Sequence, residues 1–160
     1  MADVKKGIIL KGIGGLYFVE TADAVFECKA RGIFRKSGQK PLVGDEVDIL
    51  IGEDGANNTI EKIYPRRSEL MRPPVANLDR LFILSSVRDP NPSTLIIDKM
   101  TAIACWKNIE PVIVITKDDL GDTSELRGIY EKAGIPFFSV SSRDGRGADE
   151  VKAMLSGHIS

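Results

Sequence analysis

Short stretches of alternating apolar and polar residues fill roughly the first 70 positions of the chain. In residues 26–31, Phe26, Cys28 and Ala30 are separated by charged residues, which is the two-residue period of a strand with one buried face. The pattern of roughly the first 70 residues predicts five strands and no helix, which together would form a small barrel. Glycine-bearing turns separate the expected strands: Val4–Leu10, Leu16–Glu20, Ala24–Ala30, Glu46–Ile51 and Thr59–Tyr64.

The pattern changes after Arg72-Pro73-Pro74, which we interpret as a stiff, extended joint. Beyond it, apolar strands at Leu81–Val87, Val112–Ile115 and Phe137–Val140 alternate with segments of helical period. Strand and helix repeated three times predict a parallel sheet with right-handed crossovers. The expected inward faces of the three helices are Ile96, Met100, Ile103 and Ala104 after a cap at Ser93; Leu126, Ile129, Tyr130 and Ala133 before Gly134; and Val151, Met154 and Leu155 within Ala148–Leu155.

Composition adds few constraints to this picture. With 160 residues, 42% of them hydrophobic, the chain can form packed cores. The 22 Lys and Arg residues balance 23 Asp and Glu residues, so no overall charge favours nucleic acid or a membrane. No apolar stretch approaches about 18 residues and no signal pattern begins the chain, which predicts a cytoplasmic protein. Cys28 and Cys105 lie far apart and are expected to be reduced core residues.

A local cluster of positive charge occurs between Cys28 and Gly44. This segment contains five basic residues and no Asp or Glu. Cations interleaved with an aromatic residue suit phosphate contacts and base stacking, and the OB-type barrel is a frequent nucleic-acid binder. The alternatives are a solvated hairpin and a core position for the aromatic residue. The predicted RNA-binding residues are Lys29, Arg31, Phe34, Arg35, Lys36 and Lys40.

The strongest chemical signal is the run Thr116-Lys117-Asp118-Asp119-Leu120, directly after the strand Val112–Ile115. Open α/β sheets bind ligands at the carboxyl ends of their strands. A carboxylate there can accept hydrogen bonds from both N1–H and the exocyclic amine of guanine, a pair of donors that adenine lacks. A wrong base would leave a desolvated carboxylate unpaired, at a cost of about 1–3 kcal/mol. The lysine stem would lie along the base. The alternative is an ordinary surface turn.

Five separate segments occur in a specific order: Gly-Ile-Phe-Arg-Lys at 32–36, Pro-Leu-Val-Gly-Asp at 41–45, Arg-Pro-Pro-Val-Ala-Asn-Leu-Asp-Arg at 72–80, Pro-Val-Ile-Val-Ile-Thr-Lys-Asp-Asp-Leu at 111–120 and Val-Ser-Ser at 140–142. Together they resemble the bacterial ribosome small-subunit-dependent GTPase A family. The resemblance implies a multidomain β plus α/β fold. An OB-fold domain over residues 1–71 would contact ribosomal RNA. Residues 75–160 would form part of a circularly permuted P-loop GTPase domain, whose guanine-specificity motifs come first.

The family's base-recognition pattern begins with Asn, where this chain has Thr116. Lys117 and Asp119 match the pattern, and Ser141-Ser142 match a loop whose backbone N–H meets the guanine O6. For that serine pair, helix capping is the alternative. Residues 144–147 fit D-x-x-G formally, but we interpret them as a turn. The guanine-binding residues that the resemblance implies are Thr116, Lys117, Asp118, Asp119, Ser141 and Ser142.

No G-x-x-x-x-G-K-[ST] segment occurs in the 160 residues, so the groups that hold β- and γ-phosphates and Mg²⁺ are missing. The resemblance places that loop just beyond residue 160 and a C-terminal zinc module after it, so we interpret the chain as truncated. We predict no catalytic residue and no metal site in these 160 residues, and no GTP turnover by them alone.

The leading functional hypothesis is a GTP-binding, GTP-hydrolysing factor for late assembly of the small ribosomal subunit, which uses GTP or GDP with Mg²⁺ when complete. The expected partners are the small subunit with its rRNA and a guanine nucleotide, with no membrane and a monomeric state. The main alternative is an RNA-binding or ribosome-binding module without nucleotide hydrolysis. A different nucleotide-binding α/β protein is disfavoured by the missing phosphate loop and by the N-terminal motifs.

Overall fold

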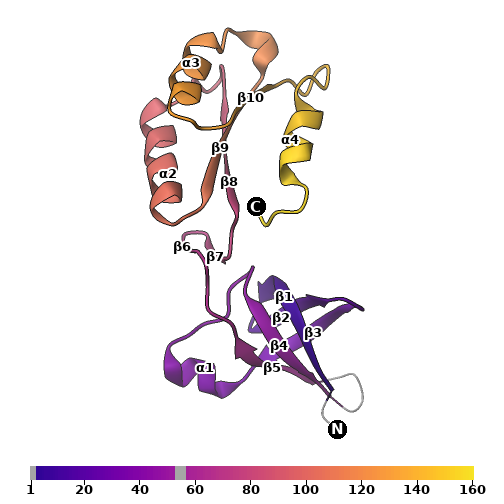
Figure 1. Cartoon of the computed structure of the whole chain (residues 1–160). Helices are drawn as coiled ribbons and strands as arrows, with labels where there is room; N and C mark the ends of the chain where they lie inside the picture. The colour runs from indigo at the N-terminus through magenta and orange to yellow at the C-terminus, as the bar shows by residue number, and fades with distance from the viewer. Residues whose placement is uncertain (1–2, 53–56) are drawn as a thin grey trace. The chain divides into compact units, whose positions relative to one another are not determined.

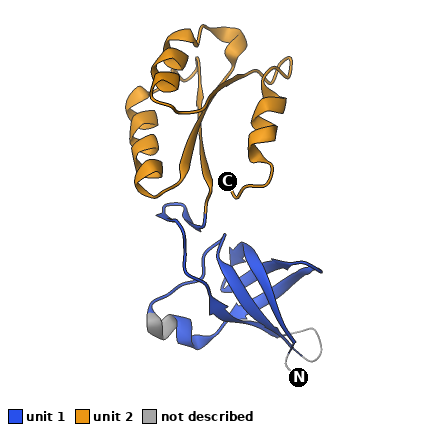
Figure 2. Cartoon of the chain, viewed as in Figure 1, with its two compact units in different colours: residues 1–77 blue, residues 78–160 orange. Residues whose placement is uncertain are grey.

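The computed structural model describes residues 3–52 and 57–160, with the backbone alone for residues 35–37. The chain divides into two units, Met1–Asn77 and Leu78–Ser160, each with its own hydrophobic core (Figure 2). The first contains a closed β-barrel and the second a parallel α/β sheet. The fold class predicted from the sequence is therefore confirmed.

The barrel of the first unit has the strand order β1-β2-β3-β5-β4 (Figure 1). Neighbouring strands are antiparallel except β3 and β5, which are parallel. Closure leaves this sheet without an open edge. The five strands agree with those predicted from the alternating pattern: β1 (Asp3–Ile13), β2 (Leu16–Thr21), β3 (Val25–Ala30), β4 (Glu46–Ile51) and β5 (Asn58–Ile63).

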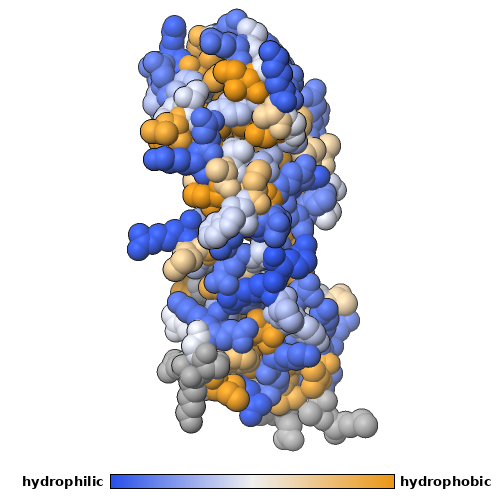
Figure 3. Space-filling model, turned by 60° about the vertical axis from the view of Figure 1, so that its left-hand side comes forward, coloured by the Kyte–Doolittle hydropathy of each residue, from blue (hydrophilic) through white to orange (hydrophobic). Residues whose placement is uncertain are grey.

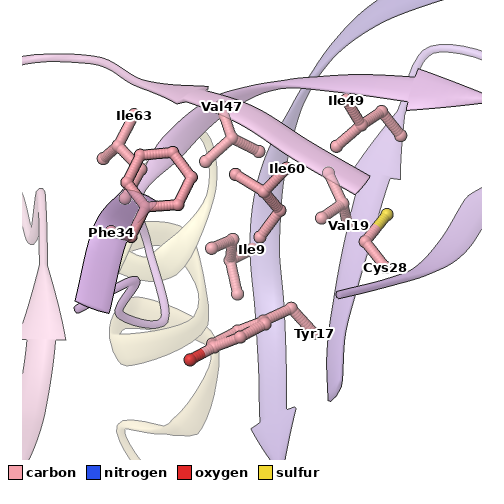
Figure 4. Close-up of a cluster of buried hydrophobic side chains, with 9 residues drawn as sticks. All are labelled: Ile9, Tyr17, Val19, Cys28, Phe34, Val47, Ile49, Ile60 and Ile63. Carbon is pink, nitrogen blue, oxygen red and sulfur yellow. The ribbon is translucent and has the colours of Figure 1, made fainter. Parts of the chain in front are cut away.

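Alternate side chains of these strands meet inside the barrel (Figure 4). On β3, Cys28 is buried, and Phe26 and Ala30 pack against the same cluster, as the alternation predicts. Burial raises the pKa of the Cys28 thiol to about 11, which keeps it protonated and unreactive at neutral pH. Cys105, also expected in a core, is exposed. The core cluster consists of Ile9, Tyr17, Val19, Cys28, Phe34, Val47, Ile49, Ile60 and Ile63.

A short helix, α1 (Gly32–Ser37), corrects the prediction that this unit has none. It begins after Arg31, whose backbone is extended, and ends at Gly38 in the left-handed conformation. The Phe34 ring is buried in the barrel core and holds the helix there. Six residues are too few to display a helical period, and tertiary packing stabilises so short a helix.

Arg72 and Pro73 form a tight turn between two short strands, which corrects the prediction of an extended joint at Arg72-Pro73-Pro74. Strands β6 (Glu69–Met71) and β7 (Pro74–Ala76) pair antiparallel, with Met71 opposite Pro74. The Arg72-Pro73 peptide bond is cis. Prolines favour extended backbone locally, but pairing of the flanking residues is a non-local contact that the local pattern does not report.

A buried ion pair connects the segments on either side of β4 and β5. Asp45 is fully buried, and its carboxylate accepts two hydrogen bonds from Arg66, Nε to Oδ1 at 2.7 Å and Nη2 to Oδ2 at 2.8 Å. Asp45 Oδ2 also accepts from the Leu42 N–H at 2.7 Å, and Arg66 donates to the Lys40 carbonyl at 2.7 Å. The hydrogen bond to Asp45 raises the pKa of Arg66 above its usual value. Each ion of this pair depends on the other, because either one alone would be a buried, uncompensated charge.

Next to this pair, residues 43–44 interlock with the end of β7. Gly44 has φ 87°, and a Cβ there would lie 2.0 Å from the Ala76 carbonyl oxygen. The Ala76 N–H donates to the Val43 carbonyl at 2.8 Å, and Asn77 Nδ2 donates to the Gly44 carbonyl at 2.9 Å. Only glycine fits this close approach of two backbones.

The second unit is a three-stranded parallel sheet with the order β10-β9-β8. In Figure 1, α2 and α3 lie on one side of the sheet and α4 on the other. The central strand β9 is covered on both faces, so all five residues from Pro111 to Ile115 are buried. The elements are β8 (Arg80–Ser86), α2 (Thr94–Trp106), β9 (Glu110–Thr116), the 3₁₀ helix η1 (Asp118–Leu120), α3 (Ser124–Lys132), β10 (Phe137–Val140) and α4 (Ala148–Leu155).

The inward faces of the helices differ in part from the prediction. In α2, Ile97, Thr101 and Ala104 are buried, whereas Ile96 and Ile103 are exposed. Helix α2 is apolar around much of its circumference, so its period could not select the buried side. Figure 3, with the side that carries α2 turned forward, shows apolar residues at the surface among polar ones.

In α3 and α4 the prediction is again partly wrong. Tyr130 is buried as predicted, and its hydroxyl donates to Asp98 Oδ1 at 2.8 Å. Burial, together with this hydrogen bond, raises the pKa of Tyr130 to about 12. Ile129 and Leu155, both expected to face inward, are exposed. Within the described residues, no helix is long and apolar enough to cross a bilayer.

The first prediction concerns the buried ion pair. Asp45→Ala leaves the Arg66 guanidinium without its buried partner, so we expect a loss of about 3–5 kcal/mol in the free energy of unfolding. The control is Glu69→Ala, which removes the half-exposed carboxylate on the same arginine and should cost less than about 1 kcal/mol. Urea titrations of both variants provide the measurement. Equal losses in the free energy of unfolding would show that burial of Asp45 does not add to the stability that the ion pair provides.

Candidate functional site

Two loops that follow neighbouring strands form the candidate site. Strand β9 leads into residues 116–120 and β10 into residues 141–147, and Val140 pairs with Thr116 at the ends of these parallel strands. Both loops therefore lie at the carboxyl edge of the sheet, where open α/β sheets bind ligands. The two groups of predicted guanine-binding residues, 116–119 and 141–142, come together at this edge.

Thr116 and Lys117 are bound to the β8 side of the sheet. Thr116 Oγ1 donates to the Ser85 carbonyl at 3.1 Å. Lys117 has φ 59°, and its Nζ donates to the carbonyls of Arg88, at 3.2 Å, and Asp89. These bonds anchor the ammonium group and hold the methylene stem across the loop that follows β8.

The carboxylate of Asp119 is oriented by a serine of the second loop. Asp119 is exposed, whereas Ser141 is only 1% exposed, and Ser141 Oγ donates to Asp119 Oδ1 at 2.9 Å. The Ser141 hydroxyl in turn accepts from the Arg143 N–H at 3.2 Å. Asp119 Oδ2 has no hydrogen-bond partner among residues 3–52 and 57–160. Because a carboxylate oxygen can accept more than one hydrogen bond, Asp119 still has capacity for two further donors.

The neighbouring carboxylate, Asp118, is bound within the protein. Its Oδ1 accepts from Thr123 Oγ1 at 3.3 Å, and its Oδ2 pairs with Arg146 Nη1 at 3.0 Å. Only 15% of the Asp118 side chain is exposed. Two adjacent aspartates therefore differ in what they can do: Asp118 attaches the loop to the rest of the fold, and Asp119 is open to a ligand.

The loop after β10 closes on itself. The Gly145 N–H donates to the Ser141 carbonyl at 3.0 Å, and the Ser141 N–H donates to the Arg146 carbonyl at 3.1 Å. Ser142 lies in the exposed turn, and its N–H donates to no acceptor in the part of the chain that the structure describes. The backbone of Arg146 donates to Asp144 at 3.2 Å and lowers the pKa of that carboxyl. Residues 144–147 thus form the turn that the sequence predicts.

The predicted RNA-binding residues lie on β3, α1 and the segment after it. Lys29, Arg31 and Lys40 are exposed. Arg31 forms an ion pair with Glu61 of β5, a counter-charge that is absent from the local sequence. The surface is therefore less positive than residues 28–44 alone suggest.

Three further predicted RNA-binding residues lie on α1. Phe34 is 9% exposed and belongs to the barrel core (Figure 4), so the core alternative is correct and its ring is not a stacking surface. The side chains of Arg35 and Lys36 lie outside the described residues.

Several groups at the site were not among the predicted residues. The carbonyls of Arg88 and Asp89 follow β8, and the rule that ligands gather at the carboxyl ends of parallel strands could have identified them. Arg146 and Thr123 contact Asp118 from other segments, and no spacing in the sequence signals those contacts. Among the described residues, no group of three or more His, Cys, Asp or Glu side chains could hold a metal ion.

Comparison with known protein families also divides the chain in two, with a boundary between residues 57 and 63, before the structural division after Asn77. The family described as RsgA N-terminal domain matches residues 6–57, and the family described as RsgA GTPase matches residues 63–160. The small ribosomal subunit biogenesis GTPase RsgA of Alkaliphilus metalliredigens is 42% identical over 158 residues, which cover 96% of this chain and 54% of that protein. The protein of the same description from Ruminiclostridium cellulolyticum is also 42% identical, with 96% and 52% covered. The chain therefore spans about half the length of these curated relatives.

Solved structures extend the similarity to the fold. The crystal structure of YjeQ from Thermotoga maritima superposes with a TM-score of 0.85 and 33% identity, over 99% of this chain and 59% of that one. YloQ, described as a circularly permuted GTPase, superposes with a TM-score of 0.78 and 29% identity, over 95% and 55%. Both the barrel and the α/β unit thus have counterparts in single solved chains.

Proposed function

Because the chain belongs to the RsgA GTPase family, we propose that it carries the guanine-recognition part of a GTP-binding, GTP-hydrolysing factor for late assembly of the small ribosomal subunit. The relatives' description as small ribosomal subunit biogenesis GTPases supports this role. The observation that carries the proposal is the Asp119 carboxylate, which Ser141 orients at the carboxyl edge of the sheet and which remains open to further donors.

In the proposed complex, Asp119 accepts hydrogen bonds from the N1–H and the exocyclic amine of guanine. The Ser142 N–H donates to O6, and the anchored stem of Lys117 lies along the face of the base. Thr116 and Asp118 hold the loop through Ser85 and Arg146 and do not touch the base. Adenine presents the opposite donor and acceptor pattern, so it would leave both the carboxylate and the N–H unpaired.

Hydrolysis requires groups beyond those present in these residues. Positioning of the β- and γ-phosphates and of Mg²⁺ is what catalyses phosphoryl transfer in this class, and it depends on a P-loop lysine and hydroxyl. The 160 residues contain no such segment, and the described ones contain no ligand cluster that fits zinc. We assign Mg²⁺ and zinc to other parts of the complete protein, and residues 75–160 to part of its GTPase domain.

The barrel, residues 1–71, is proposed as the rRNA-binding domain. Lys29 and Lys40 are exposed cations near α1, and Arg31 adds a third beside Glu61. A closed five-stranded barrel of OB type often binds nucleic acid with one face and its loops. The proposed partners are the small ribosomal subunit and its rRNA, and the proposed state is a cytoplasmic monomer.

The second prediction tests the base contact through Asp119→Asn. The amide presents a donor where the carboxylate accepted, so the variant should prefer xanthosine monophosphate, whose 2-oxo group accepts a hydrogen bond. NMR titrations of the chain with guanosine, adenosine and xanthosine monophosphates provide the affinities.

We expect wild type to favour guanosine monophosphate at least about tenfold over adenosine monophosphate, a difference of about 1.4 kcal/mol. Asp149→Asn, an exposed carboxylate on α4 outside both loops, is the matched control, and it should keep the guanine preference. An Asp119→Asn variant that still prefers guanosine monophosphate removes Asp119 from the site.

The third prediction concerns turnover. The 160-residue chain with Mg²⁺ and GTP should release phosphate at the rate of GTP in buffer, because no residue holds the β- and γ-phosphates. Phosphate release is measured by a coupled assay, with heat-denatured protein as the control. Turnover above that background would contradict the division of the site proposed here.

The fourth prediction tests the RNA surface. Lys29→Glu combined with Lys40→Glu should weaken binding to purified small subunits at least about tenfold, and should reduce the slope of log affinity against log salt by about 2. Lys62→Glu on β5, an exposed lysine outside residues 28–44, is the control and should change little. Unchanged binding of the double variant excludes this surface. RNA binding with no guanine preference in the titrations above would instead favour a binding module without nucleotide chemistry.

A further inference from the structure

An ion pair joins the two loops of the proposed guanine site. Arg146 Nη1 lies 3.0 Å from Asp118 Oδ2 in the loop after β9, and Nη2 lies 3.0 Å from Asp144 Oδ2 in its own loop. The guanidinium therefore bridges one carboxylate from each loop. Asp118 and Arg146 are 28 positions apart in the chain.

The acidic partner is held firmly. The hydroxyl that donates to Asp118 Oδ1 belongs to Thr123, which is 7% exposed and whose oxygen also lies 2.8 Å from Ser139 Oγ on β10. Arg127 of α3 donates to the same Ser139 hydroxyl at 3.2 Å. Both oxygens of the Asp118 carboxylate are therefore in use, and its orientation is set by β10 and α3 as well as by Arg146.

The basic partner also starts from a fixed backbone position. The Arg146 N–H donates to Asp144 Oδ1, and its carbonyl accepts from the Ser141 N–H. The next residue, Gly147, has φ 73°, and a Cβ there would lie 2.3 Å from the Ser139 carbonyl oxygen. The backbone at residues 146–147 is thus packed directly against β10. Only the side chain of Arg146 is largely exposed, at 59%.

A second link between the loops matters because guanine is rigid. Asp119 and Ser142, the groups proposed to read opposite ends of its Watson–Crick edge, lie on different loops. A single hydrogen bond between the loops, from Ser141 to Asp119, lets one loop pivot about the other. Such a pivot changes the separation of the two reading groups, and hydrogen bonds weaken steeply once their distances and angles depart from the optimum. The Asp118–Arg146 pair is a second link, one residue away, that prevents the pivot.

We propose that Arg146 is a positioning residue for guanine recognition, which acts through Asp118 to hold the Asp119 carboxylate and the Ser142 N–H at the separation that guanine requires. This inference rests on the proposed guanine contact. It assigns Asp118, the third residue of the Thr-Lys-Asp-Asp sequence, a role in base recognition besides attaching the loop to the fold.

The fifth prediction follows. Arg146→Ala should lower the ratio of guanosine to adenosine monophosphate affinity about three- to fivefold, the effect of losing an ion pair in which one partner is largely exposed. The charge-exchanged variant, Asp118→Arg with Arg146→Asp, should recover at least half of that loss. Lys152→Ala, an exposed cation on α4 away from both loops, should leave the ratio unchanged. All ratios come from NMR titrations of the 160-residue chain.

A salt series separates positioning by charge from a general loosening of the fold. At about 1 M salt the Debye length is about 3 Å, so the attraction between Asp118 and the exposed Arg146 guanidinium is weakened and the ratio of wild type should fall toward that of Arg146→Ala. A purely structural loss would lower affinity for both nucleotides and would not converge in this way. Should Arg146→Ala fail to fold, Arg146→Lys keeps the charge without the two-nitrogen bridge. Its ratio of guanosine to adenosine monophosphate affinity should then lie between the wild-type value, which Lys152→Ala should share, and half of that value.

The outcomes distinguish the two proposals. If wild type shows no preference for guanosine monophosphate, the guanine contact itself is wrong and the inference is lost with it. If wild type shows the preference and Arg146→Ala retains the full ratio at low salt, the positioning role of Arg146 is overturned and the guanine contact stands.

Discussion

The pairing of β9 with parallel neighbours on both edges is the constraint on which the candidate site depends. Thr116 at the end of β9 pairs with Ser86 of β8 and with Val140 of β10, so the three strands end level with one another. Backbone hydrogen bonds between the strands permit little sliding, because a shift of one residue would exchange the side chains that pack on the two covered faces of β9. The loops that follow the three strands must therefore meet at one edge.

Side-chain contacts then convert this common edge into a site. Lys117 binds the carbonyls after β8, Ser141 binds Asp119, and Arg146 binds Asp118. Each contact links a loop to the loop of a neighbouring strand. The proposed base contact uses only groups that remain open after these links are made, so the position of the reading groups follows from contacts that do not themselves touch a ligand.

The segments that resemble a known family have two kinds of role. Those at the carboxyl edge of the sheet, 116–119 and 140–142, carry candidate chemistry. The segments in the barrel unit lie in buried contacts. Gly44 packs against the Ala76 carbonyl, Asp45 pairs with Arg66, and Asn77 donates a hydrogen bond to the Gly44 carbonyl. Substitution at these positions would disturb packing or leave a buried charge, so their role in this fold is structural. They say nothing about a ligand.

The sequence by itself determined the elements whose pattern is local. Alternation located all five barrel strands, the continuous apolar run located β9, and both predicted loops of the guanine site do follow β9 and β10. The sequence could not show that Phe34 is buried, that Asp118 pairs with Arg146 or that Arg31 pairs with Glu61, because each partner lies on another segment. It was also wrong for part of the inward face of α2, where Ala104 is buried but Ile96 and Ile103 are exposed, because apolar residues surround this helix. Periodicity reports that an element has a buried face, whereas the partner of a particular side chain depends on which distant segments the tertiary structure brings beside it.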